Sequence, residues 1–178
     1  LLASNQIGRR ATNLGFPNGA AGGGQIYTFE NQKVTAAAIP WVQENECPLR
    51  TSNLRAPGDL ARVFASESFL DEVASGLGAD PVQFRLRYLS SDKRPAEVLT
   101  AAAKKSGWVD RPSPAPSSGT QKAAGRGIAV ANRANTMIAA VAEVEVDKVT
   151  GQVSVRKITL AHDCGLIVNP DGLKNQIE

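Results

Sequence analysis

The chain has few of the residues that build disulfide-bonded or metal-bound folds. Its 178 residues include two Cys, one His and one Met. Cys47 and Cys164 lie far apart, so neither a disulfide framework nor a closed zinc site can be built from cysteine. Aromatic residues are scarce, and 16 Gly and 10 Pro argue against a long helical bundle. We therefore expect a core of Ala, Val, Leu and Ile interrupted by many turns.

No strong charge or long apolar run marks a nucleic-acid or membrane protein. The net charge is +3, and basic residues occur at most in pairs such as Arg9-Arg10 and Lys104-Lys105, without interleaved aromatics. This pattern argues against a nucleic-acid interface. No apolar run reaches the roughly 18–20 residues needed to cross a bilayer, so we expect no membrane insertion. The composition leaves cytoplasm and periplasm equally open.

The N-terminal part, predicted over residues 1–110, holds one hairpin and three helices. Residues 1–24 are rich in turn formers, and three Pro residues between 40 and 58 indicate an extended loop. Strand-forming residues at 26–29 and 34–36 flank a polar connection and predict the hairpin.

The first helix is predicted to begin with Asp59 as its cap and to end at Gly76 or Gly78. One apolar face is expected, made of Leu60, Val63, Phe64, Leu70, Val73, Ala74 and Leu77. Glu67 falls in the register of that face. A buried carboxylate there must be paired, and we expect a structural pair with an arginine.

Two more helices follow. Asp80 as N-cap and Pro81 at the first helical position open the second. The third is predicted over 95–105, with an apolar face of Val98, Leu99, Ala102 and Ala103.

A linker rich in Pro, Ser and Gly is predicted over 111–125, followed by a second part over 126–178. Apolar and acidic residues alternate over 140–147, a turn follows at 148–151, and alternation resumes over 153–158, which predicts a β-hairpin. Residues 128–130 suit a neighbouring strand, and Asn169-Pro170 should cap a final helix. The fold class is therefore α+β, with helices packed with an antiparallel sheet.

The residues by themselves offer little catalytic chemistry. His162-Asp163-Cys164 could form a proton relay or activate Cys164 as a nucleophile, but adjacent residues at a strand end point to opposite faces. The favoured interpretation is a turn with a buried Cys and a surface His. Gly22-Gly23-Gly24 lacks the spacing of a phosphate-binding loop.

Two segments resemble the molybdopterin-binding large subunit of the molybdenum hydroxylases, the family of xanthine dehydrogenase and aldehyde oxidase. The first runs from Leu54-Arg55-Ala56-Pro57-Gly58 through the Glu67-Ser68-Phe69-Leu70-Asp71-Glu72 run to Asp80-Pro81. The second runs from Gly127 through Asp163-Cys164-Gly165 and Asn169-Pro170 to Gln176-Ile177-Glu178. Within the family, the chain is most similar to the isoquinoline 1-oxidoreductase β subunit.

The resemblance implies a partial molybdopterin-binding domain of an enzyme that hydroxylates aromatic N-heterocycles or aldehydes with oxygen from water. The parent would hold the molybdenum cofactor, molybdopterin, and pass electrons to iron–sulfur clusters on a small partner subunit. Its partners would be that subunit, the rest of the large subunit and the substrate.

Three cofactor-binding residues are implied. Arg55 and Gly58 match the turn at the molybdenum site, and Gln176 matches a glutamine that hydrogen-bonds the pterin. Ala56-Pro57 stands where xanthine-type members have Gly-Phe, so an aromatic wall against the substrate is absent or supplied by another segment. No catalytic residue is assigned, because the family's active-site Glu lies downstream of Glu178.

We expect a fragment of the parent enzyme, because the chain begins Leu1-Leu2, has Met137 as its only Met and ends inside a predicted helix. By itself such a fragment should bind no cofactor and be inactive. The alternative is an autonomous α+β protein-interaction module without enzymatic activity. A small enzyme dependent on Cys164 is a third possibility, which fast alkylation at neutral pH would reveal.

Overall fold

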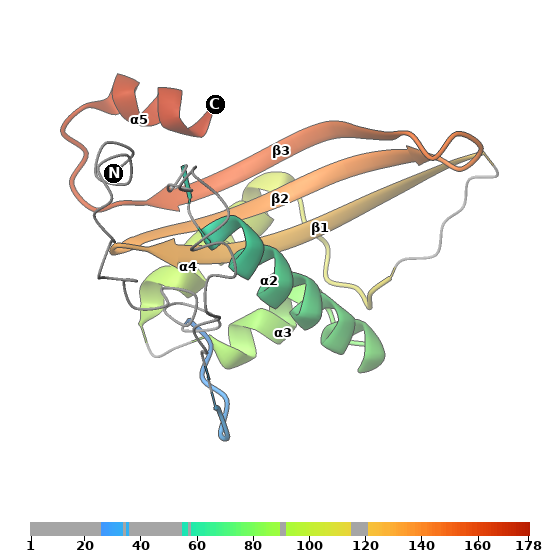
Figure 1. Ribbon diagram of the computed structural model, residues 1–178, viewed down its shortest axis with the longest axis horizontal. Helices are drawn as coiled ribbons and strands as arrows, with labels where there is room; N and C mark the ends of the chain where they lie inside the picture. Colours follow the sequence, from blue (N-terminus) through green and yellow to red (C-terminus); the bar gives the residue numbers. More distant parts are fainter. Residues whose placement is uncertain (1–25, 34, 36–54, 57, 90–91, 115–120) are drawn as a thin grey trace, which may run out of the picture.

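In the described part of the chain, a layer of helices covers one face of a three-stranded antiparallel sheet, and a further helix follows the last strand (Figure 1). The computed structural model describes residues 26–33, 35, 55–56, 58–89, 92–114 and 121–178. The helices are α2 (Asp59–Gly76), α3 (Pro81–Tyr88), α4 (Lys93–Ser106) and α5 (Pro170–Ile177). The strands β1 (Lys122–Arg133), β2 (Thr136–Asp147) and β3 (Val153–Asp163) lie in the order β1-β2-β3. The predicted α+β class is confirmed.

Local signals set most helix ends. Asp80 caps α3 by accepting hydrogen bonds from the backbone N–H groups of Val82 and Gln83 at 2.8 and 2.9 Å. Helix α4 begins at Lys93 rather than Pro95, because Asp92 caps it through the N–H of Arg94. Its predicted apolar face is buried, and Leu99 is fully enclosed.

Helix α2 differs from the prediction in two ways. Gly58, with φ of 93°, is its N-cap, and Asp59 is the first helical residue. The predicted apolar face is wrong for Leu60, Phe64 and Leu77, which are 80%, 73% and 68% exposed. The helix does bury Leu70 and Ala74 of that face, together with Glu67, and it packs against α3 and β1.

The strands are longer than the alternation predicted. Strand β1 begins at Lys122, so the last four residues of the predicted linker 111–125 belong to the sheet. Strand β3 continues past Ile158 to Asp163, and a bulge lies between Glu143 and Val144 on β2 where the two strands pair. The turn over 148–151 is confirmed, with the Asp147 carboxylate accepting from the N–H groups of Val149 and Thr150.

The first strand of the predicted N-terminal hairpin, residues 26–29, lies against the end of α3. Tyr27 makes an isolated bridge with Leu89, and the Thr28 N–H donates to the Tyr88 carbonyl at 2.7 Å. The segment therefore pairs with the end of α3, and the hairpin itself stays a prediction. Val34, Ala36 and the predicted loops over 1–24 and 40–54 lie outside the described residues.

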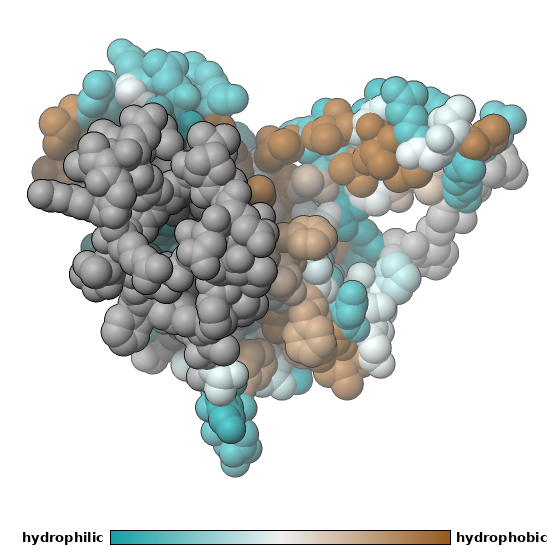
Figure 2. Space-filling model, in the orientation of Figure 1, coloured by the Kyte–Doolittle hydropathy of each residue, from teal (hydrophilic) through white to brown (hydrophobic). Residues whose placement is uncertain are grey.

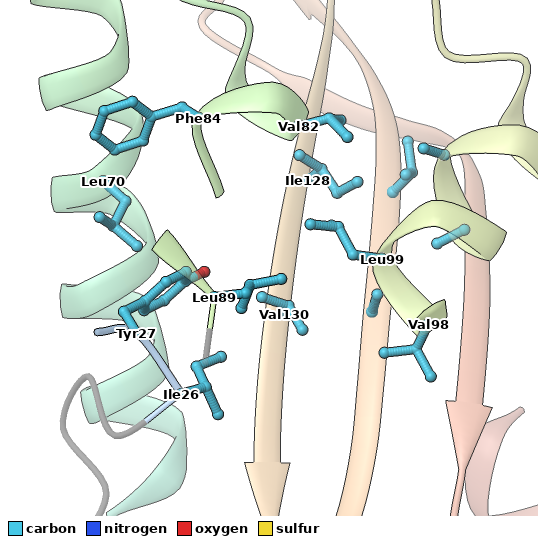
Figure 3. Packing of buried hydrophobic residues seen from close by; sticks show 14 of the residues in the cluster. Ile26, Tyr27, Leu70, Val82, Phe84, Leu89, Val98, Leu99, Ile128 and Val130 are labelled. Carbon is cyan, nitrogen blue, oxygen red and sulfur yellow. The ribbon is translucent and has the colours of Figure 1, made fainter. Parts of the chain in front are cut away.

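One hydrophobic core joins the predicted N- and C-terminal parts. Buried residues of α2, α3 and α4 meet Ile128, Val130 and Val141 of the sheet, and Figure 3 shows Leu99 beside Ile128. The division at 111–125 stays a prediction.

Candidate functional site

The two segments that carry the resemblance meet where α2 begins and α5 ends. The Nη2 of Arg55 donates a hydrogen bond of 3.2 Å to the backbone carbonyl of Gln176, 121 residues away. Both residues are exposed. Of the three predicted cofactor residues, the structure thus brings Arg55 and Gln176 into contact, and Gly58 lies three residues beyond Arg55 at the start of α2.

Backbone conformation shapes the Arg55 turn. Gly58 has φ of 93°, which favours glycine, and a Cβ built on it would have no atom within 4 Å. Ala56 also has a positive φ, of 54°. A side chain at position 58 would therefore point into open space, where a ligand could approach the peptide groups at the start of α2.

Helix α5 begins at the predicted cap, Asn169, and its end accepts the hydrogen bond from Arg55. The Asn169 Oδ1 accepts from the Gly172 N–H at 2.9 Å, and a Cβ on Gly172 would lie 3.0 Å from the Asn169 amide nitrogen. The cap thus favours glycine at 172. No residue of α5 is buried, and the helix lies over the end of β3 in Figure 1.

A cluster around Arg94, which the sequence analysis did not identify, fixes the end of β3, from which the chain leads to α5. Arg94 donates from Nε to the Asp163 carboxylate at 2.6 Å and from Nη1 to the Asn135 side chain at 2.6 Å. The hydrogen bond from Arg94 and the Gly165 N–H lower the pKa of Asp163 to about 2. The start of α4, the β1–β2 turn and the end of β3 are thereby joined. A lone Arg two residues after a helix cap carried no sequence signal for these distant partners.

His162 and Asp163 do not converge with Cys164 on a common atom. Asp163 bonds Arg94, while Ile138 pairs with His162 and Met137 with Asp163, which places adjacent residues on opposite faces of β3. His162 and Cys164 are both half-buried, so the expectation of a buried Cys and a surface His is not met. Among the described residues, no group of three or more His, Cys, Asp or Glu side chains could hold a metal ion.

Glu67 has the structural role predicted for it. Its carboxylate accepts from Arg85 Nε at 2.9 Å, the Tyr27 hydroxyl at 2.8 Å and the Val130 N–H at 2.9 Å. Burial, reinforced by the Glu67 charge, raises the pKa of Tyr27. This cluster lies in the core, and all three of its donors to Glu67 belong to the protein, so it is no ligand site.

A concave surface lies near the start of β1, and the charged side chains that line it bond to other residues of the protein. Arg111, Arg126 and Arg156 line it together with Glu143. Arg126 stacks 5.2 Å from the Trp108 ring centre and donates to the carbonyls of Ser106 and Gly107, while Arg156 bonds Glu145. These contacts lie away from the Arg55 and Gln176 pair, and we assign no ligand to them.

The groups around Arg55 can form hydrogen bonds with a polar ligand. A guanidinium, an exposed carboxamide and unobstructed backbone at Gly58 match a large polar ligand that accepts hydrogen bonds. No described helix is long and apolar enough to span a membrane.

Comparison with curated proteins gives three bacterial oxidoreductases. The chain is 32% identical, over 85% of its length, to one subunit of the nicotinate dehydrogenase of Pseudomonas putida. It is 35% identical, over 65% of its length, to the beta subunit of the isoquinoline 1-oxidoreductase of Brevundimonas diminuta. It is also 35% identical, over 63% of its length, to a membrane-bound aldehyde dehydrogenase of Gluconacetobacter polyoxogenes, whose name assigns it pyrroloquinoline quinone.

The chain spans only a small part of each relative, 13%, 14% and 16% respectively. No solved structure matches. The family model of the molybdopterin cofactor-binding domain matches residues 72–178, which include α3, α4, the whole sheet and α5. The chain therefore belongs to the molybdopterin cofactor-binding domain family.

Proposed function

We propose that residues 1–178 are part of the molybdopterin-binding subunit of a molybdenum hydroxylase that oxidises an aromatic N-heterocycle or an aldehyde. The names of two relatives, nicotinate dehydrogenase and isoquinoline 1-oxidoreductase, specify N-heterocyclic substrates, and the third specifies an aldehyde. Iron–sulfur clusters on a small partner subunit would receive the electrons.

The contact between Arg55 and Gln176 carries the proposal. Sequence resemblance assigns both residues to one cofactor although 121 positions separate them, and the fold places one against the other.

Each residue has a distinct task in this proposal. Gly58 lets the backbone at the start of α2 approach the cofactor closely. The Gln176 carboxamide both donates and accepts hydrogen bonds, which suits a pterin edge. Arg55 holds the end of α5 through the Gln176 carbonyl and keeps its other N–H groups for the ligand.

The chemistry itself would come from the cofactor, and the protein contributes binding and orientation. When bound, the molybdenum centre supplies a two-electron oxidation that uses oxygen from water. We assign no catalytic base to this chain and propose that it lies elsewhere in the parent enzyme.

The test uses the complete subunit encoded by the gene, with substitutions Arg55→Ala and Gln176→Ala. We expect each to lower the molybdenum and pterin content of the purified subunit at least about tenfold, because each removes cofactor hydrogen bonds worth about 1.5 kcal/mol or more. Arg87→Ala and Gln152→Ala, at exposed positions away from the pair, are the matched controls. Full cofactor content in both test variants would refute the assignment.

The same measurements on the purified 178-residue chain address its predicted inactivity. We expect no stoichiometric molybdenum and no dye reduction with N-heterocycles or aldehydes, because other cofactor-binding segments of the parent are needed. A stoichiometric metal signal would overturn this part of the proposal.

A further inference from the structure

The sheet has an outer face, turned away from α2, α3 and α4, that carries almost only apolar side chains. The register of the strands defines it. The inner face contains Ile128 opposite Val141 and Val130 opposite Ala139, all buried beneath the helices. Side chains alternate along a strand, so the residues between these pairs point outward.

The outer face is apolar on every strand. On β1 it consists of Ala123, Gly125, Gly127, Ala129 and Ala131. Opposite them on β2 lie Val146, Val144, Ala142, Ala140 and Ile138. On β3, the residues that pair with this side of β2 are Val153, Val155, Ile158 and Leu160. Arg133, Thr136 and His162 occur only where this face ends.

None of these apolar residues is buried in the chain as it stands. Val153 and Val155 are 61% exposed and Ile158 is 58% exposed. Figure 2 shows hydrophobic surface along β2 and β3. A contiguous apolar patch of this kind marks an interaction surface rather than ordinary solvent-exposed sheet.

The charges of the strands lie on the opposite face. Lys122, Arg126, Glu143 and Glu145 occupy the inner side, from the C-terminal end of α4 outward. They neutralise one another there, since Lys122 bonds Glu145 at 2.9 Å. A half-solvated antiparallel sheet usually turns its polar residues outward. Over residues 122–126 and 143–147, this sheet instead has its charged residues on the inner face and apolar residues on the outer face. We therefore expect another part of the protein to cover the outer face.

We propose that a second apolar layer covers the outer face, and that this layer belongs to the same polypeptide, from outside residues 1–178. Most of each curated relative lies outside the segment that this chain matches, which supplies chain enough for such a layer. The Ala and Gly residues of β1 let the layer approach the backbone closely, whereas the larger side chains of Val155 and Ile158 hold it farther from β3. The layer must bring aliphatic side chains and no charge.

This inference rests on the proposed membership in a larger polypeptide and does not depend on cofactor binding. Molybdenum content is therefore measured on every preparation described below. Intact cofactor with an uncovered face would defeat the inference alone, and a covered face without cofactor would defeat only the proposed function.

Thiol labelling of two engineered cysteines measures whether the face is covered. Val155→Cys places a thiol on the outer face, and Val149→Cys places one in the β2–β3 turn, where the valine is 79% exposed. In the 178-residue chain, both sites should react at rates within about twofold of each other. In the complete subunit, position 155 should react at least about tenfold more slowly than position 149. Peptide mass spectrometry separates these sites from Cys47 and Cys164.

Lysine substitutions provide a second measurement that does not depend on labelling. In the complete subunit, Val155→Lys should lower Tm by roughly 5–10 °C, because it buries a charge, whereas Val149→Lys should leave Tm unchanged. In the 178-residue chain, neither should change Tm appreciably, because both positions face water.

Three results would overturn the proposal. Equal labelling of both sites in the complete subunit would show an uncovered face. Protection of position 155 in the 178-residue chain that increases with protein concentration would assign the face to a second copy. A gene that encodes only these 178 residues would leave no further chain to form the layer.

Discussion

At the scale of single residues, the buried carboxylate of Glu67 ties together segments that are distant in the chain. It holds the Tyr27 segment, α3 and β1 to helix α2 through three hydrogen bonds. Arg85, which has no exposed side-chain surface, depends on Glu67 and on the partly exposed Asp71 for its countercharge. Removing one partner of such a pair leaves an uncompensated buried charge.

Glu67→Ala should therefore lower the free energy of unfolding of the 178-residue chain by about 3–5 kcal/mol. Glu72→Ala, on the exposed side of the same helix, should change it by less than about 0.5 kcal/mol. Urea denaturation followed by circular dichroism measures both values. Equal effects of the two substitutions would mean that the Glu67 cluster does not organise the core.

At the scale of elements, two aspartates begin successive helices with unequal tertiary roles. Asp92 caps α4 through the Arg94 N–H at 3.1 Å. Asp80 caps α3 and also accepts from Trp108 Nε1 at 2.9 Å and from the Arg111 N–H at 3.0 Å, both beyond the end of α4. One carboxylate thus joins the start of α3 to the segment that leads toward the sheet.

Asp92→Ala should cost about 1 kcal/mol of unfolding free energy, the usual value of a helix cap. Asp80→Ala should cost about 2–3 kcal/mol, because it also leaves the Trp108 and Arg111 donors unpaired. Trp108 fluorescence should shift to longer wavelength only in the Asp80 variant. A larger loss from Asp92→Ala would contradict this ranking.

At the scale of the whole molecule, the ion pair between Arg94 and Asp163 joins the helix layer to the sheet at the C-terminal end of β3. The pKa of Asp163 is lowered from 3.8 to about 2, mainly by the hydrogen bond from Arg94. A depressed carboxyl pKa stabilises the fold above the unfolded-state value, and this stabilisation is lost as the pH falls through about 2.

Asp163→Asn should consequently have its largest destabilising effect above pH 4, and that difference from the parent chain should shrink between pH 4 and pH 2. Thermal unfolding midpoints across this pH range measure the difference. Glu97→Gln, an exposed carboxyl on α4, is the control and should show no such convergence. A constant difference at every pH would mean that the Asp163 charge does not contribute.

The sequence by itself determined those features whose signals are local. Asp80-Pro81 predicted the start of α3, the apolar spacing of α4 predicted its buried face, and alternation predicted the β2–β3 hairpin. The two segments over residues 54–85 and 127–178 indicated the family that the comparison then identified.

Only the tertiary structure decided which distant residues meet. Helical spacing placed Leu70 and Ala74 on the buried face of α2 but could not reveal that Leu60 and Phe64, predicted on the same face, stay exposed. Alternation marked two faces of the sheet without telling which one the helices cover. Which face is buried depends on contacts between segments many residues apart, and a local sequence pattern does not specify the segment that packs against it.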